Sequence, residues 1–349
     1  MNKRDIKIKV NEFIEENGLI ADGSTVLAAV SGGADSLCLL YVLHDIMESG
    51  RTIELRAVHV NHHLRDEADE DADHVRVCCE SLGIPLAVYD VNVEERMERE
   101  GVSCEEAGRM LRYEAFEEEA GKTGGKEVLI AVAHTMNDRA ETMLINMWRG
   151  SGLKGLVGIP VRRGNIIRPL LCLSREDTET YLDECGVSYC MDKTNAEDDY
   201  TRNRIRHHIL PKAEDSVNEQ AVLHMNETAD QIMKADDYIE AGIKAAYAEC
   251  VREENDLSVL YIDKNSFLSL HEYMQERLLL KCMERVCGKA KDISAVHVKA
   301  LKGLFSKERG KRLDLPYYIT AVRKDSYVAM YLQPDKFIGR NKPSAKKSQ

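Results

Sequence analysis

The segment 31–36 carries the side chains best suited to bind a phosphate. It reads Ser-Gly-Gly-Ala-Asp-Ser and follows the apolar run 26–30. The two glycines let the backbone approach an anion closely, and the free N–H groups of the helix predicted to follow would point at it. Ser31 and Ser36 add hydroxyl donors, and Asp35 is suited to hold a cation shared with the phosphates.

The sequence of this loop separates it from the commonest nucleotide-binding motifs. It lacks the Gly-Lys-Ser/Thr ending of a Walker A loop and the G-x-G-x-x-G fingerprint of dinucleotide-binding proteins. Ser-Gly-Gly-x-Asp-Ser after a strand is instead similar to the PP-loop of the N-type ATP pyrophosphatases. That family cleaves ATP between its α and β phosphates and adenylates a substrate. The alternative is a turn that only joins a strand to a helix.

A helix predicted from Ser103 carries arginines that could act on the same nucleotide. Ser103 is the expected N-cap, with Glu106 completing a capping box. Glu106, Arg109 and Tyr113 lie near one face of this helix, and Arg112 is adjacent. An arginine near ATP can neutralise the charge that builds on the phosphates as pyrophosphate leaves. A surface salt bridge is the structural alternative.

Two carboxylates follow the predicted strand 127–133. Asp138 and Glu141 are three residues apart and therefore share a helix face, one turn beyond the strand and beside His134. Such a pair could clamp an amino group or hold a magnesium ion. Acidic residues also stabilise the N-terminus of a helix, which is the alternative explanation.

Histidines and basic residues form two further groups. His59, His62 and His63 come with the end of the predicted strand 53–60, where lining a nucleotide pocket is favoured over metal binding because no cysteine or carboxylate partner is obvious. A solvated polar loop is the alternative. Four basic residues without an intervening acid could contact phosphates or form a solvated face: Arg202, Arg204, Arg206 and Lys212.

The elements that must position these side chains alternate along the first half of the chain. Strands are predicted at 25–30, 53–60, 86–91 and 127–133, and helices at 36–48, 68–82, 103–120 and 137–148. This alternation is typical of βαβ units and predicts an α/β fold, a Rossmann-like parallel sheet with helices on both faces. Ligands of such sheets bind beyond the carboxyl ends of the strands, where each cluster falls.

The pattern changes near Pro211. One long helix is predicted over 214–250, followed by helices at 272–287 and 294–305 and strands at 317–323 and 326–332. We therefore predict a catalytic domain at 1–213, a smaller and mainly helical domain at 214–333, and a basic tail at 334–349.

Composition restricts the class of protein. The chain has 349 residues, 44% of them hydrophobic and 31% charged, and no apolar run approaches the length of a membrane span. The net charge of −12 argues against a broadly basic nucleic-acid binder, so any nucleic-acid contact must be local. The ten cysteines include no C-x-x-C pair, which favours reduced thiols in a cytoplasmic protein.

The order of the motifs resembles the tRNA(Ile)-lysidine synthase family. The PP-loop is followed by H-V-N-H-x-L-R, L-R-Y, A-H-x-x-x-D-x-x-E-T and R-G-S-G, and then by matching segments at 168–171, 192–195 and 200–206. The resemblance covers residues 25 to about 210. The chain departs from the family pattern at His63, where a glycine is common, at Gly108, where alanine is usual, and at Asn137, where aspartate is frequent. Long members also carry a further C-terminal domain.

The resemblance implies an ATP-dependent ligase that uses Mg²⁺. It would attach L-lysine to C2 of the wobble cytidine of a tRNA(Ile) with a CAU anticodon, through an adenylated base, releasing pyrophosphate and AMP. The implied ATP-binding residues are Ser31, Gly32, Gly33, Ala34, Asp35 and Ser36.

The resemblance also implies roles for the other clusters. Asp35 would hold the metal, Arg112 would stabilise charge at the reacting phosphate, and Asp138 and Glu141 would clamp the lysine in a pocket lined by His134. The arginine-rich segment and the helical domain would bind the tRNA by phosphate contacts. We also expect a homodimer, and the absence of a long apolar run leads us to expect no membrane partner.

Three alternatives remain. A PP-loop tRNA thiolase would typically need a cysteine pair or an iron–sulfur cluster. A small-molecule ligase resembling the synthetases of NAD or GMP would use the same phosphate loop. A catalytically inactive tRNA-binding module would be favoured by an eroded loop, whereas residues 31–36 are complete.

Overall fold

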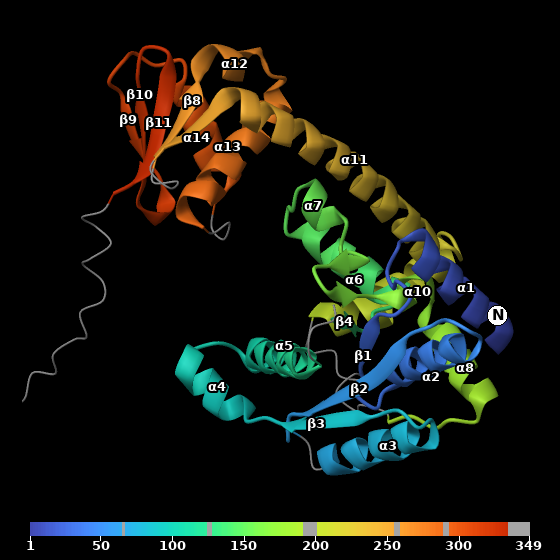
Figure 1. The fold of residues 1–349 in the computed structure, drawn as a ribbon. Coiled ribbons are helices and arrows are strands. Elements are labelled where there is room, and N and C mark those ends of the chain that lie inside the picture. Colours follow the sequence, from blue (N-terminus) through green and yellow to red (C-terminus); the bar gives the residue numbers. More distant parts are fainter. Residues whose placement is uncertain (65–66, 124–127, 191–200, 255–258, 289–292, 334–349) are drawn as a thin grey trace, which may run out of the picture. The chain divides into compact units, whose positions relative to one another are not determined.

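The computed structural model describes residues 1–64, 67–123, 128–190, 201–254, 259–288 and 293–333 (Figure 1). By its internal contacts the chain divides into two compact units, Met1–Met233 and Lys234–Gln349. The division falls within helix α11 (Ala221–Cys250), beyond the end predicted for the catalytic domain at residue 213. The predicted basic tail lies outside the described residues.

The first unit is built on a six-stranded sheet of order β3-β2-β1-β4-β6-β5. Its strands are β1 (Thr25–Ala29), β2 (Glu54–Asn61), β3 (Leu86–Asp90), β4 (Val128–Ala131), β5 (Arg162–Arg163) and β6 (Ile166–Ile167). The first four and β6 are parallel, and β5 pairs antiparallel with β6. The predicted α/β class and its parallel sheet are confirmed.

Thirteen helical segments of the described chain accompany this sheet, the last of them shared with the second unit. They are α1 (Lys3–Glu16), α2 (Ala34–Glu48), α3 (Ala68–Ser81), α4 (Val93–Glu100), α5 (Cys104–Lys122), α6 (Met136–Trp148), α7 (Leu153–Leu156), η1 (Pro169–Cys172), α8 (Arg175–Cys185), α9 (Thr201–Arg204), the π-helical turn η3 (Ile205–Ile209), α10 (Leu210–Ser216) and α11.

Helices cover both faces of the sheet because the central strand is apolar on both. Val26 and Ala28 of β1 are fully buried in a core shared with α1, α2 and α8, whereas Leu27 packs with Phe116 of α5 in a separate cluster. This double burial explains why β1 reads as a continuous apolar run. Burial on both faces also holds β1 in place, and residues 31–36 follow the carboxyl end of this strand.

Local signals set several helix ends. Ser103 caps α5, as predicted, by accepting a hydrogen bond from the Glu106 N–H at 3.2 Å. The single helix predicted over 214–250 is wrong: α10 ends at Ser216 and α11 begins at Ala221. The Asn218 side chain accepts a hydrogen bond from the Gln220 N–H at 2.9 Å, which offers the backbone an alternative to helix continuation.

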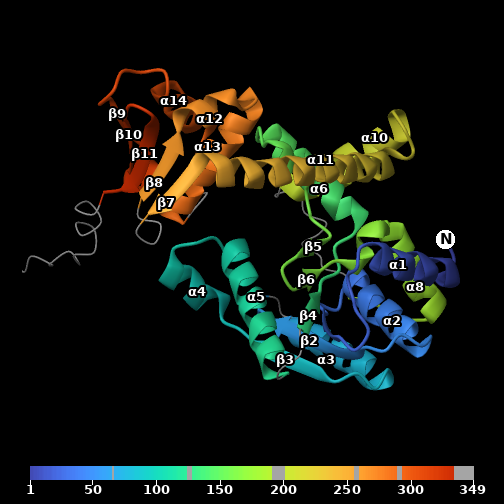
Figure 2. The same cartoon turned by 45° about the horizontal axis from the view of Figure 1, so that its top comes forward.

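The second unit combines helices with a five-stranded antiparallel sheet of order β7-β8-β11-β10-β9 (Figure 2). The strands are β7 (Val251–Glu254), β8 (Val259–Asp263), β9 (Arg312–Asp314), β10 (Ile319–Arg323) and β11 (Tyr327–Leu332), and the helices are α12 (Lys264–Ser269), α13 (Glu272–Cys287), α14 (Ala295–Leu304) and the short η4 (Pro316–Tyr318). Helices α13 and α14 and strands β10 and β11 were predicted; the other strands were missed. None of the helices described in either unit is long and apolar enough to cross a bilayer.

Candidate functional site

Residues 31–36, called here the phosphate loop, connect β1 to α2. Gly32 has a φ of +92°, a region that favours glycine over residues with a Cβ. Gly33 is the N-cap of α2 and supplies no side-chain acceptor, so the first N–H groups of that helix are left for a ligand. The loop therefore presents a helix N-terminus of the kind that binds anions.

The Ser36 hydroxyl holds the loop in this shape. Its Oγ accepts hydrogen bonds from the Ser31 N–H at 3.0 Å and from the Ser31 hydroxyl at 3.1 Å. It donates in turn to the Gly33 carbonyl at 2.9 Å. The buried Ser36 thus closes the loop from inside, while Ser31 is exposed to solvent.

Asp35 lies in the first turn of α2 and is held by α8. The Thr178 hydroxyl donates to its Oδ1 at 2.7 Å, and Arg175 Nη2 lies 3.7 Å from its Oδ2. Burial raises the pKa of the Asp35 carboxyl above its usual value, an effect that Arg175 and Thr178 offset in part and that the charge of Asp138 reinforces. Sequence reasoning missed both α8 residues, since nothing in the sequence links α8 to the phosphate loop.

Asp138 and Glu141, called here the carboxylate pair, face the first turns after residue 200. Glu141 is fully buried and accepts hydrogen bonds from Arg202 Nε at 2.6 Å and Arg206 Nε at 2.7 Å. Asp138 Oδ1 accepts from Arg202 Nη2 at 2.9 Å and from Arg206 Nη2 at 3.3 Å. Two of the four residues predicted to bind tRNA thus pair with the two predicted to clamp lysine.

A capping box fixes the other oxygen of Asp138. Its Oδ2 accepts hydrogen bonds from the Thr135 N–H at 2.8 Å and the Thr135 hydroxyl at 3.2 Å. Burial alone would raise the pKa of Asp138, but Arg202, His134 and the Thr135 N–H together lower it below its usual value. Asp138 is therefore a carboxylate near neutral pH, so the site holds fixed negative charge.

Two buried histidines are neutral, His134 beside the carboxylate pair and His62 beside Arg112. Burial lowers the pKa of His134 to about 4. The pKa of His62 is also lowered to about 4, mainly by burial and to a smaller extent by the positive charge of Arg112. The Nδ1 atom of each is buried and has no hydrogen-bond partner within the described parts of the chain. The His62 ring lies 3.8 Å from the point where a Cβ on Gly108 would sit, so the alanine usual in the family would fit there.

The other histidines of the 59–63 segment have structural partners. His59 Nδ1 lies 2.8 Å from the Val30 carbonyl. His63 has a φ of +49°, and its ring nitrogens lie 2.8 Å from Asp90 and 3.5 Å from Asp69. The left-handed backbone explains why glycine is common at this position in the family, and the two carboxylates explain how a histidine is held there.

The remaining predicted residues lie apart from the carboxylate pair. Arg204 is exposed and donates to the Thr201 hydroxyl at 3.2 Å, and Lys212 pairs with Asp215 at 3.5 Å. Arg112 shares α5 with Arg109, and the contacts described for it include no residue of the phosphate loop. The predicted motif at 192–195 lies outside the described residues.

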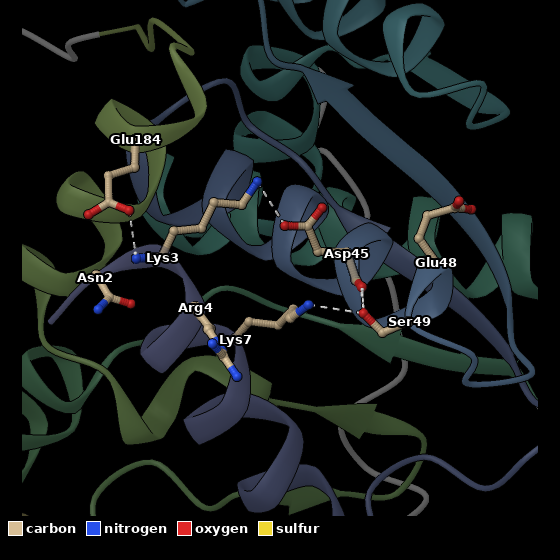
Figure 3. A pocket seen from close by; sticks show the side chains of 8 residues that line it. All are labelled: Asn2, Lys3, Arg4, Lys7, Asp45, Glu48, Ser49 and Glu184. Atoms are coloured by element: carbon tan, nitrogen blue, oxygen red, sulfur yellow. Dashed lines mark hydrogen bonds and ion pairs between the residues drawn. The ribbon is translucent and has the colours of Figure 1, made fainter.

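A pocket of about 490 Å³ lies away from these groups, between the N-terminus of α1 and the C-terminal ends of α2 and α8 (Figure 3). Two of its lysines have partners within the pocket: Lys3 pairs with Asp45 at 2.9 Å, and Lys7 donates to Ser49 at 3.0 Å. Asp45 is ten residues beyond Asp35 on α2, about 15 Å along the helix. The pocket is therefore separate from the phosphate loop.

Comparison with known proteins defines the class of the first unit. Residues 2–213 match the PP-loop domain family. The fold is also similar to that of the U34-tRNA thiolase NcsA from Methanococcus maripaludis, with a TM-score of 0.55, 16% sequence identity and coverage of 66% of this chain and 79% of that one. The first unit, with its phosphate loop between β1 and α2 of a parallel sheet, is thus a PP-loop domain.

Relatives that match most of this chain identify its family within the PP-loop proteins. The chain is 35% identical over 316 residues to the tRNA(Ile)-lysidine synthase of Caldanaerobacter subterraneus subsp. tengcongensis, covering 90% of this chain and 67% of the relative. It is 35% identical over 325 residues to that of Clostridioides difficile, covering 92% and 70%. The chain belongs to the tRNA(Ile)-lysidine synthase family and spans about two thirds of the length of these relatives.

Proposed function

We propose that the chain joins L-lysine to C2 of the wobble cytidine in a tRNA(Ile) with a CAU anticodon, using ATP. The cytosine carbonyl oxygen attacks the α-phosphate, pyrophosphate leaves, and the lysine ε-amine displaces AMP. The observation that carries this proposal is a buried carboxylate pair that holds the guanidinium groups of Arg202 and Arg206 and lies one ion pair away from the phosphate loop. Arg175 links the two, because its Nη2 lies 3.7 Å from both Asp35 and Asp138.

ATP would bind with its phosphates at the N-terminus of α2. The N–H groups of Gly33 and Ala34 are the donors there, and the Ser31 hydroxyl would join them by turning away from Ser36. Arg112 is the arginine proposed to stabilise charge at the reacting phosphate. These roles rest on the family pattern and on the shape of the loop.

Mg²⁺ fits this site as a companion of the nucleotide. The parts of the chain that the structure describes hold no group of three or more His, Cys, Asp or Glu side chains that could bind a metal by themselves. Mg²⁺ commonly takes one or two carboxylates together with substrate phosphates. Asp35 would supply the carboxylate, and the ion would neutralise charge on the phosphates.

Lysine binding at the carboxylate pair requires an exchange of cations. All four oxygens of Asp138 and Glu141 already accept hydrogen bonds, so a lysine ammonium must replace a guanidinium. Arg202 is the one that leaves more easily, because its side chain is 39% exposed and that of Arg206 only 18%. Arg202 would then be free to contact a tRNA phosphate.

His134 would complete the lysine pocket. Its Nδ1 atom is buried without a described partner and is neutral near pH 7, so it can accept a hydrogen bond from a substrate. The exposed Arg204 and Lys212 would contact tRNA phosphates, and the second unit would position the tRNA. A cytoplasmic location and assembly into a homodimer complete the proposal, the latter testable by light scattering.

The deciding experiment follows labelled lysine. The full chain is incubated with Mg-ATP, labelled L-lysine and an isoleucine tRNA transcript with a CAU anticodon, with a methionine tRNA as control. We expect label in the isoleucine tRNA and one AMP released per lysine. Asp138→Asn should raise the lysine KM roughly tenfold or more, since a charge-assisted hydrogen bond is lost. Asp183→Asn, at an exposed aspartate on α8, serves as the matched control.

Two outcomes would contradict the proposal. ATP cleavage without lysine transfer would indicate another acceptor, and absence of both reactions would indicate a binding module. An unchanged lysine KM in Asp138→Asn would remove the clamp assignment while leaving the reaction itself in place.

A further inference from the structure

Arg175 occupies a central position that the sequence motifs did not indicate. It is the first residue of α8, and its Nη2 atom lies 3.7 Å from Asp35 Oδ2 and 3.7 Å from Asp138 Oδ1. These carboxylates belong to two different motifs, one after β1 and one after β4. Among the described residues, Arg175 is the only side chain recorded as an ion-pair partner of both.

The backbone of Arg175 is fixed, whereas its guanidinium is not. Its N–H donates to Asn137 Oδ1 at 3.1 Å, and Ser174 forms a capping box with Asp177 at the start of α8. The 3.7 Å separations of Nη2 exceed hydrogen-bond distance, so these are ion pairs without a direct hydrogen bond. The side chain is 29% exposed. It can therefore move without disturbing the helix that carries it.

Asp35 needs a positive neighbour while no ligand is bound. Its side chain is only 24% exposed, and the Asp138 carboxylate lies on the other side of a single shared ion-pair partner, Arg175 Nη2, at 3.7 Å from each. Partial burial and a neighbouring like charge both disfavour an ionised carboxyl group. Arg202 and Arg206 neutralise Asp138 but are not recorded as ion-pair partners of Asp35 in the described structure. Among the described residues, Arg175 is thus the cation in an ion pair with Asp35, and the Thr178 hydroxyl supports it at 2.7 Å, whereas the charge of Arg206 acts on Asp35 from farther away.

We propose that Arg175 is a positioning residue that stands in for the divalent cation at Asp35 until the nucleotide arrives. The guanidinium holds the Asp35 and Asp138 carboxylates close together, and it would leave Asp35 when that carboxylate takes the metal that accompanies ATP. The freed guanidinium then lies beside the phosphates, where a cation is favoured. This inference rests on the proposed use of ATP and Mg²⁺ at Asp35.

The test measures metal binding in the absence of ATP, lysine and tRNA. Mn²⁺, whose unbound form gives a paramagnetic resonance signal, is titrated into the full chain at pH 7. Arg175→Gln removes the resident cation and should tighten Mn²⁺ binding about tenfold, the effect on a divalent ion of one unit charge at about 5 Å in water. Arg175→Lys keeps the charge and should bind Mn²⁺ as weakly as the unmodified chain.

Two controls locate the effect. Arg76→Gln removes a similar charge from α3, where Arg76 pairs with Asp73, and should leave Mn²⁺ affinity unchanged. Adding Asp35→Asn to Arg175→Gln should abolish the gain, because the added affinity arises at Asp35. Circular dichroism confirms that each variant is folded.

The results separate this inference from the proposed function. Equal or weaker Mn²⁺ binding in Arg175→Gln would overturn it, as would Arg175→Lys behaving like Arg175→Gln, since shape rather than charge would then be responsible. Because no substrate is present, these outcomes do not depend on lysine transfer. If the labelled-lysine assay fails but Arg175→Gln binds Mn²⁺ more tightly, the tRNA acceptor would be rejected and the role of Arg175 would stand.

Discussion

His134 shows how burial sets the chemistry of a single side chain. The imidazole follows β4 among cationic neighbours, and burial is the main reason why its pKa falls to about 4. In the unfolded chain a histidine has its ordinary pKa near 6.5. The unfolded state therefore binds a proton between these two values that the folded state does not. Folding stability must rise with pH over this window.

This linkage gives a prediction for His134→Gln. Lowering the pH from 6.5 to 5 should cost the unmodified chain about 1.5 kcal/mol more of its free energy of unfolding than it costs the variant. The difference disappears above pH 7, where both states are neutral. Urea unfolding can be followed by the fluorescence of Trp148, the only tryptophan of the chain, which lies on α6. If the free energy of unfolding changed with pH in the same way for the unmodified chain and for His134→Gln, His134 would be protonated in the folded protein as readily as in the unfolded one.

The residue types of the site could be predicted, but not all of their partners. The loop 31–36 and the pair Asp138 and Glu141 stand out because their spacing is local. Arg202 lies 61 residues from Glu141, and Thr178 lies 143 residues from Asp35, so their contacts depend on the tertiary fold. The backbone at His63 could have been predicted, because glycine is common at this position in the family and glycine favours the left-handed conformation that His63 adopts.

At the level of elements, prediction worked where the chain is strongly patterned. Strands β1 to β4 are apolar runs flanked by helical periodicity, and each was placed within a few residues. Strands β5 and β6 have only two residues each, too few for any alternation to appear. Helix α8 was missed because its amphipathic pattern is short, although Ser174 and Asp177 form a capping box that marks its start.

The phosphate loop offers a prediction with an internal control. Gly32 has a φ of +92°, so Gly32→Ala forces a Cβ into a strained conformation and should lower the free energy of unfolding by about 1–2 kcal/mol. Gly33 has a φ of −76°, and its added Cβ would meet Ser31 Oγ at an ordinary 3.7 Å. Gly33→Ala should therefore leave stability nearly unchanged. Trp148 fluorescence in urea measures both, and equal losses would contradict the backbone argument.

For the whole molecule, charge decides how a tRNA could be bound. A chain of net charge −12 repels a polyanion overall, so binding must come from the few basic residues that face it. Phosphate contacts release counterions, and affinity then falls steeply with salt. Arg204 is exposed, and its guanidinium donates only to the neutral Thr201 hydroxyl among the contacts described. It is thus a ready phosphate contact.

Arg204→Gln should weaken tRNA binding and reduce the slope of log affinity against log salt by about one unit. Filter binding at four salt concentrations gives this slope. The matched control is Lys7→Gln, which removes a positive charge at the separate pocket of α1 and should leave the slope unchanged. A slope that falls equally in both variants would indicate a general effect of net charge.

Helix α11 takes part in the hydrophobic cores of both units. Val222 of α11 packs with Met136 and Ile205 of the first unit, and Asn226 donates to the Met136 carbonyl at 3.0 Å. Further along the same helix, Ile243 and Cys250 lie in the core of the second unit. The sequence of this helix therefore contributes residues to two separate hydrophobic cores. A chain cut at residue 213 would lose the α11 side of the first core, so the PP-loop unit draws part of its stability from beyond its own sequence motif.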